Sequence, residues 1–391
     1  MRTKYLTIIL IILITLIFSL NTMALAAESL RIDFIDVGQA DSILIQLPNK
    51  EKMLIDGGNN EDGDLIVKYL TKLKINKLDY LVATHPHEDH IGGLDNIINN
   101  FKVNKVYMPK ISHTSQTFRD LLIAIKEKGL KISIAKAGVS LIDKGDVQVR
   151  IIGPVKEDYK ELNNYSAIVK INFNDTSFLF TGDAEAEVEE ELVTSKIDLA
   201  ADLLKIGHHG SSSSTTLAFL EKVNPQYGVI SVGKDNKYGH PTKFTLEKLN
   251  RTGVEVYRTD QLGTIIAISD GQKITFNHKA PFISTTKISN NKLPLTISNL
   301  NLKDEIVLIT NNGSEDINIS NWKLLSLRGK QEFIFPQGTI IKAGESLKVV
   351  SGRNASKGKG QIIWTKSYIW NNNGDAAQLY DLKGNLIAEY Y

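Results

Sequence analysis

The chain has 391 residues, with 46 Lys and Arg against 44 Asp and Glu, 8 His and no Cys. At about 100–200 residues per domain, this length predicts two or three domains. Hydrophobic residues at 42% and charged residues at 23% exclude a disordered, collagen-like or coiled-coil chain. The absence of cysteine excludes disulfide scaffolds and thiolate zinc sites, so a transition metal would need imidazole and carboxylate ligands. A formal charge of +2 excludes a strongly polycationic binder.

The first 26 residues have the pattern of a secretory signal peptide. Arg2 and Lys4 precede an apolar run over residues 6–20, and small residues follow at 24–27. An uncleaved membrane anchor is the alternative, but the apolar run is shorter than the ~20 residues that a span needs. We therefore expect residues 1–26 to be removed and the protein to be secreted, and extracellular or associated with the cell envelope. Their removal leaves a net charge of zero.

Residues 27–278 alternate between strand and helix patterns. Short β-branched or alternating runs predict strands, and apolar residues at helical spacing predict helices. Strands are expected at 30–36, 42–47, 52–56, 78–83, 147–152, 167–173, 177–180 and 228–232, and helices at 64–73, 117–128, 185–192, 215–222 and 242–251. This order predicts a mixed α/β layered domain.

The composition changes near residue 279. Residues 279–294 contain Ser, Thr, Asn and Lys, two prolines and no acid, which predicts a linker at 279–293. Residues 294–391 contain short strand patterns separated by Gly, Pro and Asn turns, which predicts a β-sandwich. Residues 27–278 have 30 Lys and Arg against 35 Asp and Glu, so the first domain is mildly acidic. We expect two domains, 27–278 and 294–391.

The segment Thr84–Gly93 carries the strongest chemical signal. It contains three imidazoles and a carboxylate within six residues, a density that is typical of metal ligation. In an extended loop, residues two apart point the same way, so His85 and His87 can hold one cation. Asp89 and His90 then face a second cation.

Other loops supply further candidate ligands. Asp183 follows the expected strand at 177–180, and His208, His209 and His240 follow other strand-like runs. Loops that each follow a strand predict that these side chains meet at one edge of a sheet.

Six motifs in this order resemble those of the metallo-β-lactamase-fold hydrolases, over about residues 30–277. Within that family they look most like the hydrolase domain of ComEC-type competence proteins, and they are also similar to secreted phosphorylcholine esterases. The motifs are Phe34–Asp41, Leu54–Gly58, His85–Gly93, Leu179–Asp183, Leu204–Ser211 and Gly239–Pro241. The resemblance implies an αββα sandwich.

The resemblance also implies two divalent metal ions, with Zn²⁺ expected and Mn²⁺ as the alternative. The implied metal ligands are His85, His87, Asp89, His90, Asp183, His209 and His240, and the implied catalytic residues are Asp89, His208 and His240. His85 and His87 would hold the first ion. Asp89, His90 and His240 would hold the second, and Asp183 would bridge the two.

The first ion site departs from the broader superfamily, which usually has a histidine before the bridging aspartate. The corresponding segment here is Asn163–Ser166. We expect the double histidine to replace the missing ligand, with His209 favoured over His208. The other would face substrate phosphate or donate a proton. His113 is an alternative for the missing ligand.

Other residues have two interpretations each. Asp56 is either an acceptor that fixes a ligand imidazole or a turn residue. Ser211–Ser214 is a helix N-cap region rather than a nucleophile, and His278 is expected to face solvent. Lys205 and Lys234 either contact a phosphate or are solvated.

Residues 294–391 resemble a bacterial lamin-tail domain, an immunoglobulin-like β-sandwich. The resembling segments are Asp304–Thr310, Asn318–Leu324, Phe333–Gly338, Ala343–Val350 and Trp370–Asp381. The three tryptophans (Trp322, Trp364 and Trp370) lie here, and we expect them in the core, with an exposed aromatic platform as the alternative. Such a domain would tether the protein to nucleic acid, to the envelope or to another protein.

These patterns predict a secreted, dinuclear metallohydrolase, namely a phosphodiesterase or nuclease acting on DNA or another extracellular phosphodiester. A phosphorylcholine esterase or lactonase is the enzymatic alternative, and an adhesion or scaffold protein with a structural metal is the non-enzymatic one. The large ligand set argues against the last, because a structural zinc needs only four ligands. No transmembrane channel is evident in the sequence, so we do not expect this chain to transport DNA itself. Affinity for DNA would need the lysines of the linker and tail (Lys279, Lys287, Lys292, Lys357 and Lys359).

Overall fold

The structure is a computed structural model that describes residues 29–279 and 294–390, except residues 373, 383 and 385. The expected signal peptide, and the expected linker apart from Lys279, lie outside the described residues. None of the helices in the described part of the chain combines the length and the apolar character that crossing a membrane requires.

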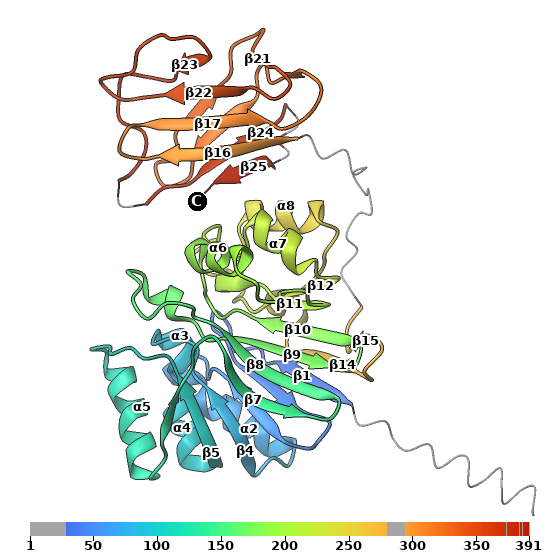
Figure 1. Cartoon of the computed structure of the whole chain (residues 1–391). Coiled ribbons are helices and arrows are strands. Elements are labelled where there is room, and N and C mark those ends of the chain that lie inside the picture. Colours follow the sequence, from blue (N-terminus) through green and yellow to red (C-terminus); the bar gives the residue numbers. More distant parts are fainter. Residues whose placement is uncertain (1–28, 280–293, 373, 383, 385, 391) are drawn as a thin grey trace, which may run out of the picture.

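Two β-sheets form the centre of the first domain (Figure 1). One has eight strands in the order β15-β14-β1-β2-β3-β4-β5-β6, and the other has seven in the order β13-β12-β11-β10-β9-β8-β7. The strands are β1 Leu30–Phe34, β2 Ile43–Gln46, β3 Lys52–Ile55, β4 Lys77–Val82, β5 Lys102–Met108, β6 Ile132–Ile134, β7 Val139–Lys144, β8 Val147–Gly153, β9 Ile168–Phe173, β10 Thr176–Phe180, β11 Leu203–Lys205, β12 Tyr227–Ile230, β13 Glu255–Arg258, β14 Ile265–Ser269 and β15 Ile274–Phe276.

Alternation of side chains along the strands packs the two sheets face to face. Ile32 and Phe34 of β1 point into the core between the sheets, where the ring of Phe34 lies 6.2 Å from that of Phe180 on β10. Leu44 and Leu54 point to the opposite face of the same sheet, where they pack under helices. Each sheet therefore has an inner core face and an outer helix-covered face.

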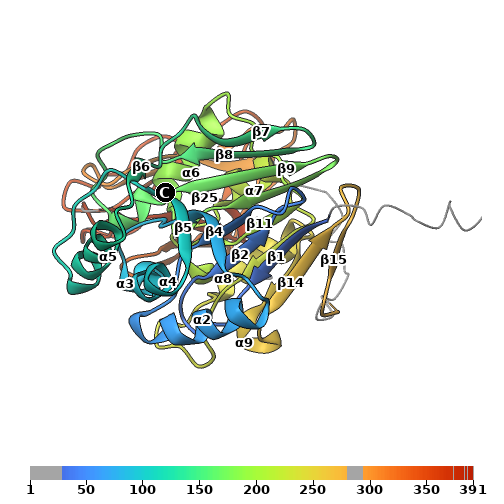
Figure 2. The ribbon, with the colours of Figure 1, turned by 90° about the horizontal axis from the view of Figure 1, so that it is seen from below.

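Helices cover both outer faces. Figure 2 shows α2, α4 and α5 on the eight-stranded sheet, and α6, α7 and α8 pack on the seven-stranded sheet. The helices are α2 Gly63–Lys72, α3 Glu88–Ile91, α4 Leu94–Asn100, α5 Gln116–Glu127, α6 Ala186–Thr194, α7 Leu217–Val223, α8 Lys243–Arg251 and α9 Thr259–Leu262, with 3₁₀ turns at Asn60–Asp62, Leu162–Tyr165 and Gly207–Gly210. The expected αββα sandwich is confirmed.

Hydroxyl caps explain where three of these helices begin. The side chains of Ser115, Thr216 and Thr242 accept hydrogen bonds from backbone N–H groups in the first turns of α5, α7 and α8. Such caps satisfy N–H groups that have no partner within the helix. The cap of α7 is Thr216, so the helix begins after the Ser211–Ser214 segment that the sequence suggested as its cap region.

The C-terminal domain is a strand-rich sandwich. Its strands are β16 Leu295–Asn301, β17 Ile306–Asn311, β18 Ile317–Asn318, β19 Lys323–Ser326, β20 Glu332–Ile334, β21 Ile340–Ile341, β22 Ser346–Val350, β23 Gln361–Ile363, β24 Ala377–Tyr380 and β25 Leu386–Tyr390. They form two four-stranded sheets, β16-β17-β22-β23 and β20-β19-β24-β25, and the pair β18-β21. Trp322 and Trp370 are buried in its core and Trp364 packs partly buried against them, so all three take the expected packing role.

The two domains contact each other through α7, α8 and β25 (Figure 1). The side chain of Glu389 on β25 accepts a hydrogen bond from the backbone N–H of Leu217 at 2.6 Å, and its other oxygen lies 3.8 Å from the ammonium of Lys248 on α8. The ring of Phe244 packs 5.6 Å from that of Tyr380. Buried polar and apolar contacts thus join the domains in addition to the expected linker.

Candidate metal centre

The candidate ligands lie on loops that leave strands at the same edge of the sandwich. Strands β3 and β4 run parallel in one sheet, and β10, β11 and β12 run parallel in the other. Loops at the carboxyl ends of parallel strands meet at one edge, where α/β proteins commonly bind ligands. The segments after β4, β10, β11 and β12 carry the histidines and aspartates named from the sequence.

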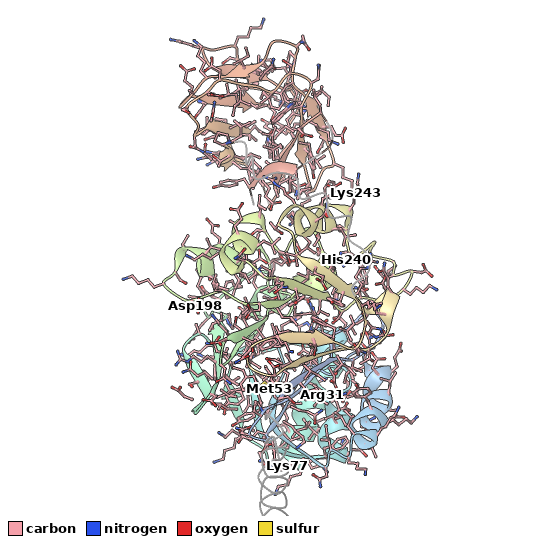
Figure 3. All side chains as sticks on the ribbon, turned by 90° about the vertical axis from the view of Figure 1, so that its right-hand side faces the viewer. Arg31, Met53, Lys77, Asp198, His240 and Lys243 are labelled. Atoms are coloured by element: carbon pink, nitrogen blue, oxygen red, sulfur yellow. The ribbon has the colours of Figure 1, made fainter. Side chains whose placement is uncertain are left out.

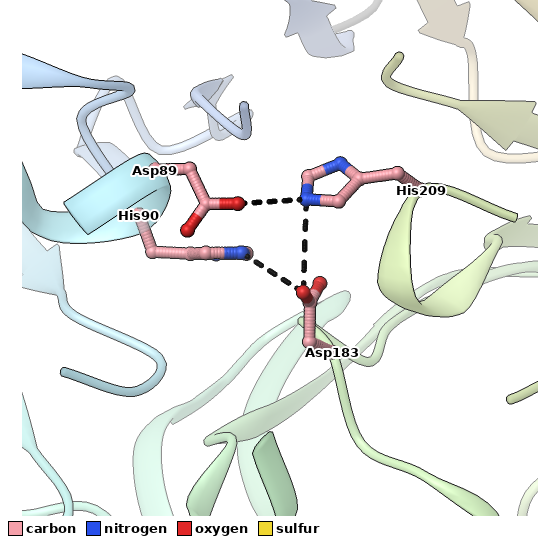
Figure 4. A group of neighbouring side chains, drawn as sticks. All are labelled: Asp89, His90, Asp183 and His209. Carbon is pink, nitrogen blue, oxygen red and sulfur yellow. Dashed lines mark hydrogen bonds and ion pairs between the residues drawn. The ribbon is translucent and has the colours of Figure 1, made fainter. Parts of the chain in front are cut away.

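Four side chains from three of these segments converge (Figure 4). Asp89, His90, Asp183 and His209 each offer one ligand atom, and these atoms all lie within 4.8 Å of one another. His90 Nε2 is 3.3 Å from Asp183 Oδ2, and His209 Nε2 is 3.3 Å from Asp89 Oδ2 and 3.6 Å from Asp183 Oδ2. We call these four residues the metal cluster.

The metal cluster fits a divalent cation. His90 Nε2 and Asp183 Oδ1 are buried and have no hydrogen-bond partner. Buried polar atoms are nearly always paired, so such orphaned atoms need an explanation. An ion held by nitrogen and oxygen ligands supplies one, because imidazole and carboxylate together suit Zn²⁺ and Mn²⁺.

Asp56 orients one of the imidazoles. Its Oδ2 accepts a hydrogen bond from His90 Nδ1 at 2.8 Å, and its two oxygens accept hydrogen bonds from the backbone N–H and hydroxyl of Thr84 at 2.8 and 2.7 Å. This arrangement directs His90 Nε2 into the metal cluster, as outer carboxylates do in metal sites. Of its two interpretations, Asp56 therefore has the geometry of an orienting acceptor.

A glycine allows the histidine-rich segment to pack directly against the backbone of the loop after β3. A Cβ at Gly92 would lie 2.2 Å from the backbone of Asn59 and Asn60, so only glycine fits there. Gly92 N–H also donates to the carbonyl of Gly58, which ties the histidine-rich segment to the loop after β3.

His85 and His87 lie beside the metal cluster. His85 is buried, with its ring centroid 4.1 Å from that of His90, and its Nε2 is 3.0 Å from Nδ1 of His87. Ser166, in the segment that lacks the usual histidine, has its hydroxyl 3.4 Å from His85 Nδ1. Asp183 is close enough to interact electrostatically with both imidazoles, and the ligand role of the pair stays a prediction.

The structure arranges the later histidines differently from the expected division. His209 lies with Asp89 and His90, the group to which the sequence analysis assigns His240. His240 instead lies next to His208, with ring centroids 5.7 Å apart, and its Nδ1 is buried without a hydrogen-bond partner. In the structure His209, and not His240, lies with Asp89 and His90, and the ligand roles of both histidines stay predictions.

The adjacent residues His208 and His209 both have a left-handed backbone conformation, and their side chains make different contacts. His208 and His209 have φ values of 50° and 53°, which are uncommon outside glycine and concentrate at functional sites. His209 donates from Nδ1 to the carbonyl of Ser231 at 3.0 Å and turns Nε2 to the metal cluster. His208 Nδ1 lies 3.3 Å from Glu185 Oε1 and 3.1 Å from Ser213 Oγ, and its Nε2 lies 3.7 Å from Asp183.

Several other candidates lie outside the cluster. Lys205 is completely buried, and its ammonium lies 2.9 Å from Asp41 Oδ2, so neither a phosphate contact nor a solvated lysine describes it. His113 Nδ1 is 2.9 Å from the hydroxyl of Ser115, and His113 is not one of the four residues of the metal cluster. His278 is half-buried, with Nε2 3.3 Å from the carbonyl of Thr264.

Two polar residues that contact the site were not singled out from the sequence. Asp41 pairs with Lys205, and its Oδ1 lies 3.6 Å from His209 Nδ1. Glu185 contacts His208. Asp41 ends the motif Phe34–Asp41 and Glu185 follows Asp183 by two residues, so both positions had a local signal but no signal of a partner.

The cluster has a strongly negative field. Burial opposes a charge on His90, but the carboxylates of Asp183, Asp56 and Asp89 raise its pKa well above the ordinary value. Burial likewise opposes ionisation of Asp183, yet His90, His209 and His208 hold its pKa well below the usual range. A field that favours imidazolium also attracts a metal cation, which would replace those protons.

An open cleft of about 1140 Å³ leads to the cluster. It is lined by Asp89, Asp183, His208, His209 and His240 at its base, and by residues of the loops after β1, β3 and β12. His208 and His240 are therefore accessible from the cleft.

Comparison with known proteins agrees with this geometry. The family model of the metallo-β-lactamase superfamily matches residues 35–234, and that of the lamin tail domain matches residues 288–391. The chain belongs to the metallo-β-lactamase superfamily and has the fold of its hydrolases, followed by a lamin tail domain.

Its curated relatives include competence proteins. It is 33% identical over 268 residues to ComE operon protein 3 of Bacillus subtilis, a match covering 64% of this chain and 34% of the relative. It is 28% identical over 232 residues to competence protein ComA of Neisseria gonorrhoeae, covering 59% of this chain and 31% of that protein. Recombination protein 2 of Haemophilus influenzae is 27% identical over 249 residues, covering 62% and 29%. The chain thus spans about a third of the length of these relatives.

Solved structures with a similar fold share little sequence. YhfI of Bacillus subtilis, a metallo-β-lactamase fold protein, is 12% identical, with a TM-score of 0.37 over 58% of this chain and 96% of that chain. CmlA of Streptomyces venezuelae, a diiron β-hydroxylase, is 14% identical, with a TM-score of 0.40 over 59% of this chain and 52% of that chain.

Proposed function

We propose that the protein is a secreted, dinuclear metal-dependent phosphodiesterase that acts on nucleic acid. The observation that carries the proposal is the metal cluster that lines an open cleft, with His90 Nε2 and Asp183 Oδ1 buried and without hydrogen-bond partners. The relation to competence proteins favours DNA as the first substrate to test. Secretion rests on the signal-peptide pattern of residues 1–26.

In this proposal, two groups of residues would each bind one metal ion, and a third group faces the substrate. Asp89, His90 and His209 would hold one ion, His85 and His87 the other, and Asp183 would lie between them. Two divalent ions, Zn²⁺ or Mn²⁺, would activate water near neutral pH and stabilise negative charge on the phosphate.

His208 has the position of a proton donor or phosphate ligand. Its side chain is 24% exposed, and its Nδ1 is held by Glu185 and Ser213. Its Nε2 is thereby fixed at the base of the cleft beside Asp183. In this proposal His208 donates a proton to the departing oxygen of the phosphodiester, and His240 contacts the substrate from the neighbouring rim.

The rival activities use the same fold. A phosphorylcholine esterase or lactonase would need the same ligands, and the tail domain would tether either enzyme to the envelope, to another protein or to nucleic acid. The substrate therefore has to be decided by direct comparison.

Metal analysis and a substrate screen on the purified protein test the proposal. We expect two divalent ions per chain and cleavage of DNA, compared with RNA, a phosphorylcholine ester and a lactone as substrates. Asp183→Ala should abolish hydrolysis and lower the metal content, because it removes the ligand between the two groups. The control Asp143→Ala alters an exposed aspartate on β7 and should change neither.

Two outcomes would contradict the proposal. A single ion in fully active protein would exclude the dinuclear site. Cleavage of phosphorylcholine esters without cleavage of DNA would replace the nuclease with the esterase.

A further inference from the structure

The loop between β12 and α8 forms one rim of the cleft. It contributes Lys234, Lys237, Tyr238 and His240 to the lining. Tyr238 is 58% exposed and lines the cleft, so its ring is accessible to a ligand that enters the cleft. Figure 3 labels His240 together with Lys243, the first residue of α8.

Tyr238 is supported from within the loop. Its ring stacks on that of His240, with centroids 5.8 Å apart and planes inclined by 26°. The ammonium of Lys237 lies 5.1 Å from the centre of the tyrosine ring. A cation and a flat ring are thus held together at the edge of the candidate metal centre.

Asn236 fixes the shape of the loop. Its Nδ2 donates to the carbonyls of Gly233 at 2.9 Å and His240 at 2.6 Å. Its Oδ1 accepts from the backbone N–H groups of Tyr238 at 3.2 Å and His240 at 3.1 Å. The aromatic rim is therefore organised before any ligand arrives, which lowers the entropic cost of binding.

The rim near α2 and α3 has the opposite charge. Glu61, Asp62 and Glu88 line the cleft there. A duplex carries phosphates on both sides and would bring some of them against these carboxylates. A single strand can follow the lysine-bearing rim alone, and its unpaired bases have free faces for stacking.

We propose that this rim binds single-stranded nucleic acid, with Tyr238 stacking on an unpaired base and Lys234 and Lys237 contacting the flanking phosphates. The inference rests on the proposed phosphodiesterase function and names its substrate class. Stacking of a base on an aromatic side chain is sequence-tolerant, so the strand would be bound by shape and charge.

A binding assay tests the inference without catalysis. Fluorescence anisotropy measures the Kd of the full chain for a labelled 12-nucleotide DNA strand, and a chelator in the buffer prevents cleavage. Removing one stacking partner typically weakens binding roughly tenfold, so Tyr238→Ala should raise the Kd by about that factor. Tyr238→Phe keeps the ring and should stay within about twofold of the wild type. The control Tyr368→Ala removes a tyrosine that is 61% exposed on the tail domain and should not change the Kd.

A strand with abasic positions separates stacking from a general disturbance of the loop. The penalty of Tyr238→Ala should largely disappear on the abasic strand, because the two changes remove the same contact. Equal penalties on intact and abasic strands, an unchanged Kd for Tyr238→Ala, or tighter binding of duplex than of single strand would each overturn the inference.

Hydrolysis measured with metal distinguishes the two proposals. A strand that binds through Tyr238 but is not cut would support the binding rim and contradict the phosphodiesterase. Cleavage of DNA whose KM is the same in the wild type and in Tyr238→Ala would support the phosphodiesterase and contradict the binding rim.

Discussion

Two buried groups of charged side chains, one within the first domain and one where that domain meets the tail, differ in how fully their polar atoms are hydrogen-bonded. The metal cluster leaves His90 Nε2 and Asp183 Oδ1 without hydrogen-bond partners. The second group, which we call the docking cluster, consists of Glu189, Lys248 and Glu389, and its charges meet protein partners.

The docking cluster joins three elements. Glu189 on α6 accepts hydrogen bonds from the backbone N–H groups of Thr215 at 2.6 Å and Thr216 at 2.7 Å. Lys248 donates to the carbonyl of Ser214 at 3.2 Å and lies beside Glu389 of the tail. Buried charges that are hydrogen-bonded to the protein serve structure, whereas buried atoms beside a cleft that have no hydrogen-bond partner are available to a ligand. Changes in the docking cluster should therefore cost stability, and changes in the metal cluster should cost metal binding.

The largest expected effect on stability is at Lys248. Lys248→Met removes a fully buried ammonium together with its ion pair to Glu389 and its hydrogen bond to the carbonyl of Ser214, and breaking a buried pair typically costs about 3–5 kcal/mol. Denaturant unfolding of the full chain measures the loss. Lys243→Met lies on the same helix but alters an exposed ion pair with Glu247, and should cost less than about 1 kcal/mol. Equal effects of the two variants would show that the docking cluster does not stabilise the protein.

A smaller, pH-dependent effect is expected at Glu189. Burial raises its pKa from 4.5 to about 7, although the hydrogen bonds from Thr216 and Thr215 oppose the shift. The folded protein then retains a proton that the unfolded chain releases between these values. The stabilisation is complete below pH 4.5 and declines as pH rises towards 7, by up to about 3 kcal/mol at 1.36 kcal/mol per pKa unit.

Glu189→Gln should remove this part of the pH dependence, because an amide does not titrate. It should also lower stability overall, since one carbonyl oxygen replaces two acceptors. Urea unfolding at several pH values between 5 and 8 measures both effects. An unchanged slope in the variant would assign the pH dependence to other groups.

The smallest of these effects should separate metal binding from stability. Asp56→Asn replaces the acceptor of His90 Nδ1–H with a group that can present a donor there, which weakens metal affinity about 10–100-fold for comparable outer partners. Competition with a chromogenic chelator measures the affinity, and the metal-free protein should lose less stability than Lys248→Met does, because Asn keeps one acceptor for Thr84 and breaks no buried lysine pair. A metal-free variant that unfolds as readily as Lys248→Met would remove the distinction between the clusters.

Local sequence pattern predicted most of the elements that position the site. The strands before Asp56, His85 and Asp183, and the helices α2 and α6, lie within a few residues of their expected bounds, whereas α3 and α4 after His85 were not assigned. The returning strand β14, which pairs with β1, was not assigned, because its position depends on a partner more than 200 residues earlier in the chain.

Pairing across the chain accounts for the parts of the site that the sequence did not reveal. The choice between His208 and His209 depends on their left-handed backbone, which places the ring of His209 in the metal cluster. The burial of Lys205 depends on Asp41, and the joining of the domains depends on Lys248 and Glu389. The linker pattern gives no indication of that last pair.

The contact between the tail and the first domain also implies that the two halves of the candidate metal centre unfold locally as separate units. The loops after β11 and β12 lead into α7 and α8, the helices that contact β25, whereas the His85–Gly93 segment leads into α3 and α4 on the other sheet. Regions that share buried contacts tend to open together as cooperative units. Opening of the tail contact would therefore loosen His208, His209 and the Tyr238 rim as one unit, while His85, His87 and His90 keep their places. The two halves of the site would then exchange their amide hydrogens at different rates. The tail contact would control the exchange rate only in the half that contains His208, His209 and the Tyr238 rim.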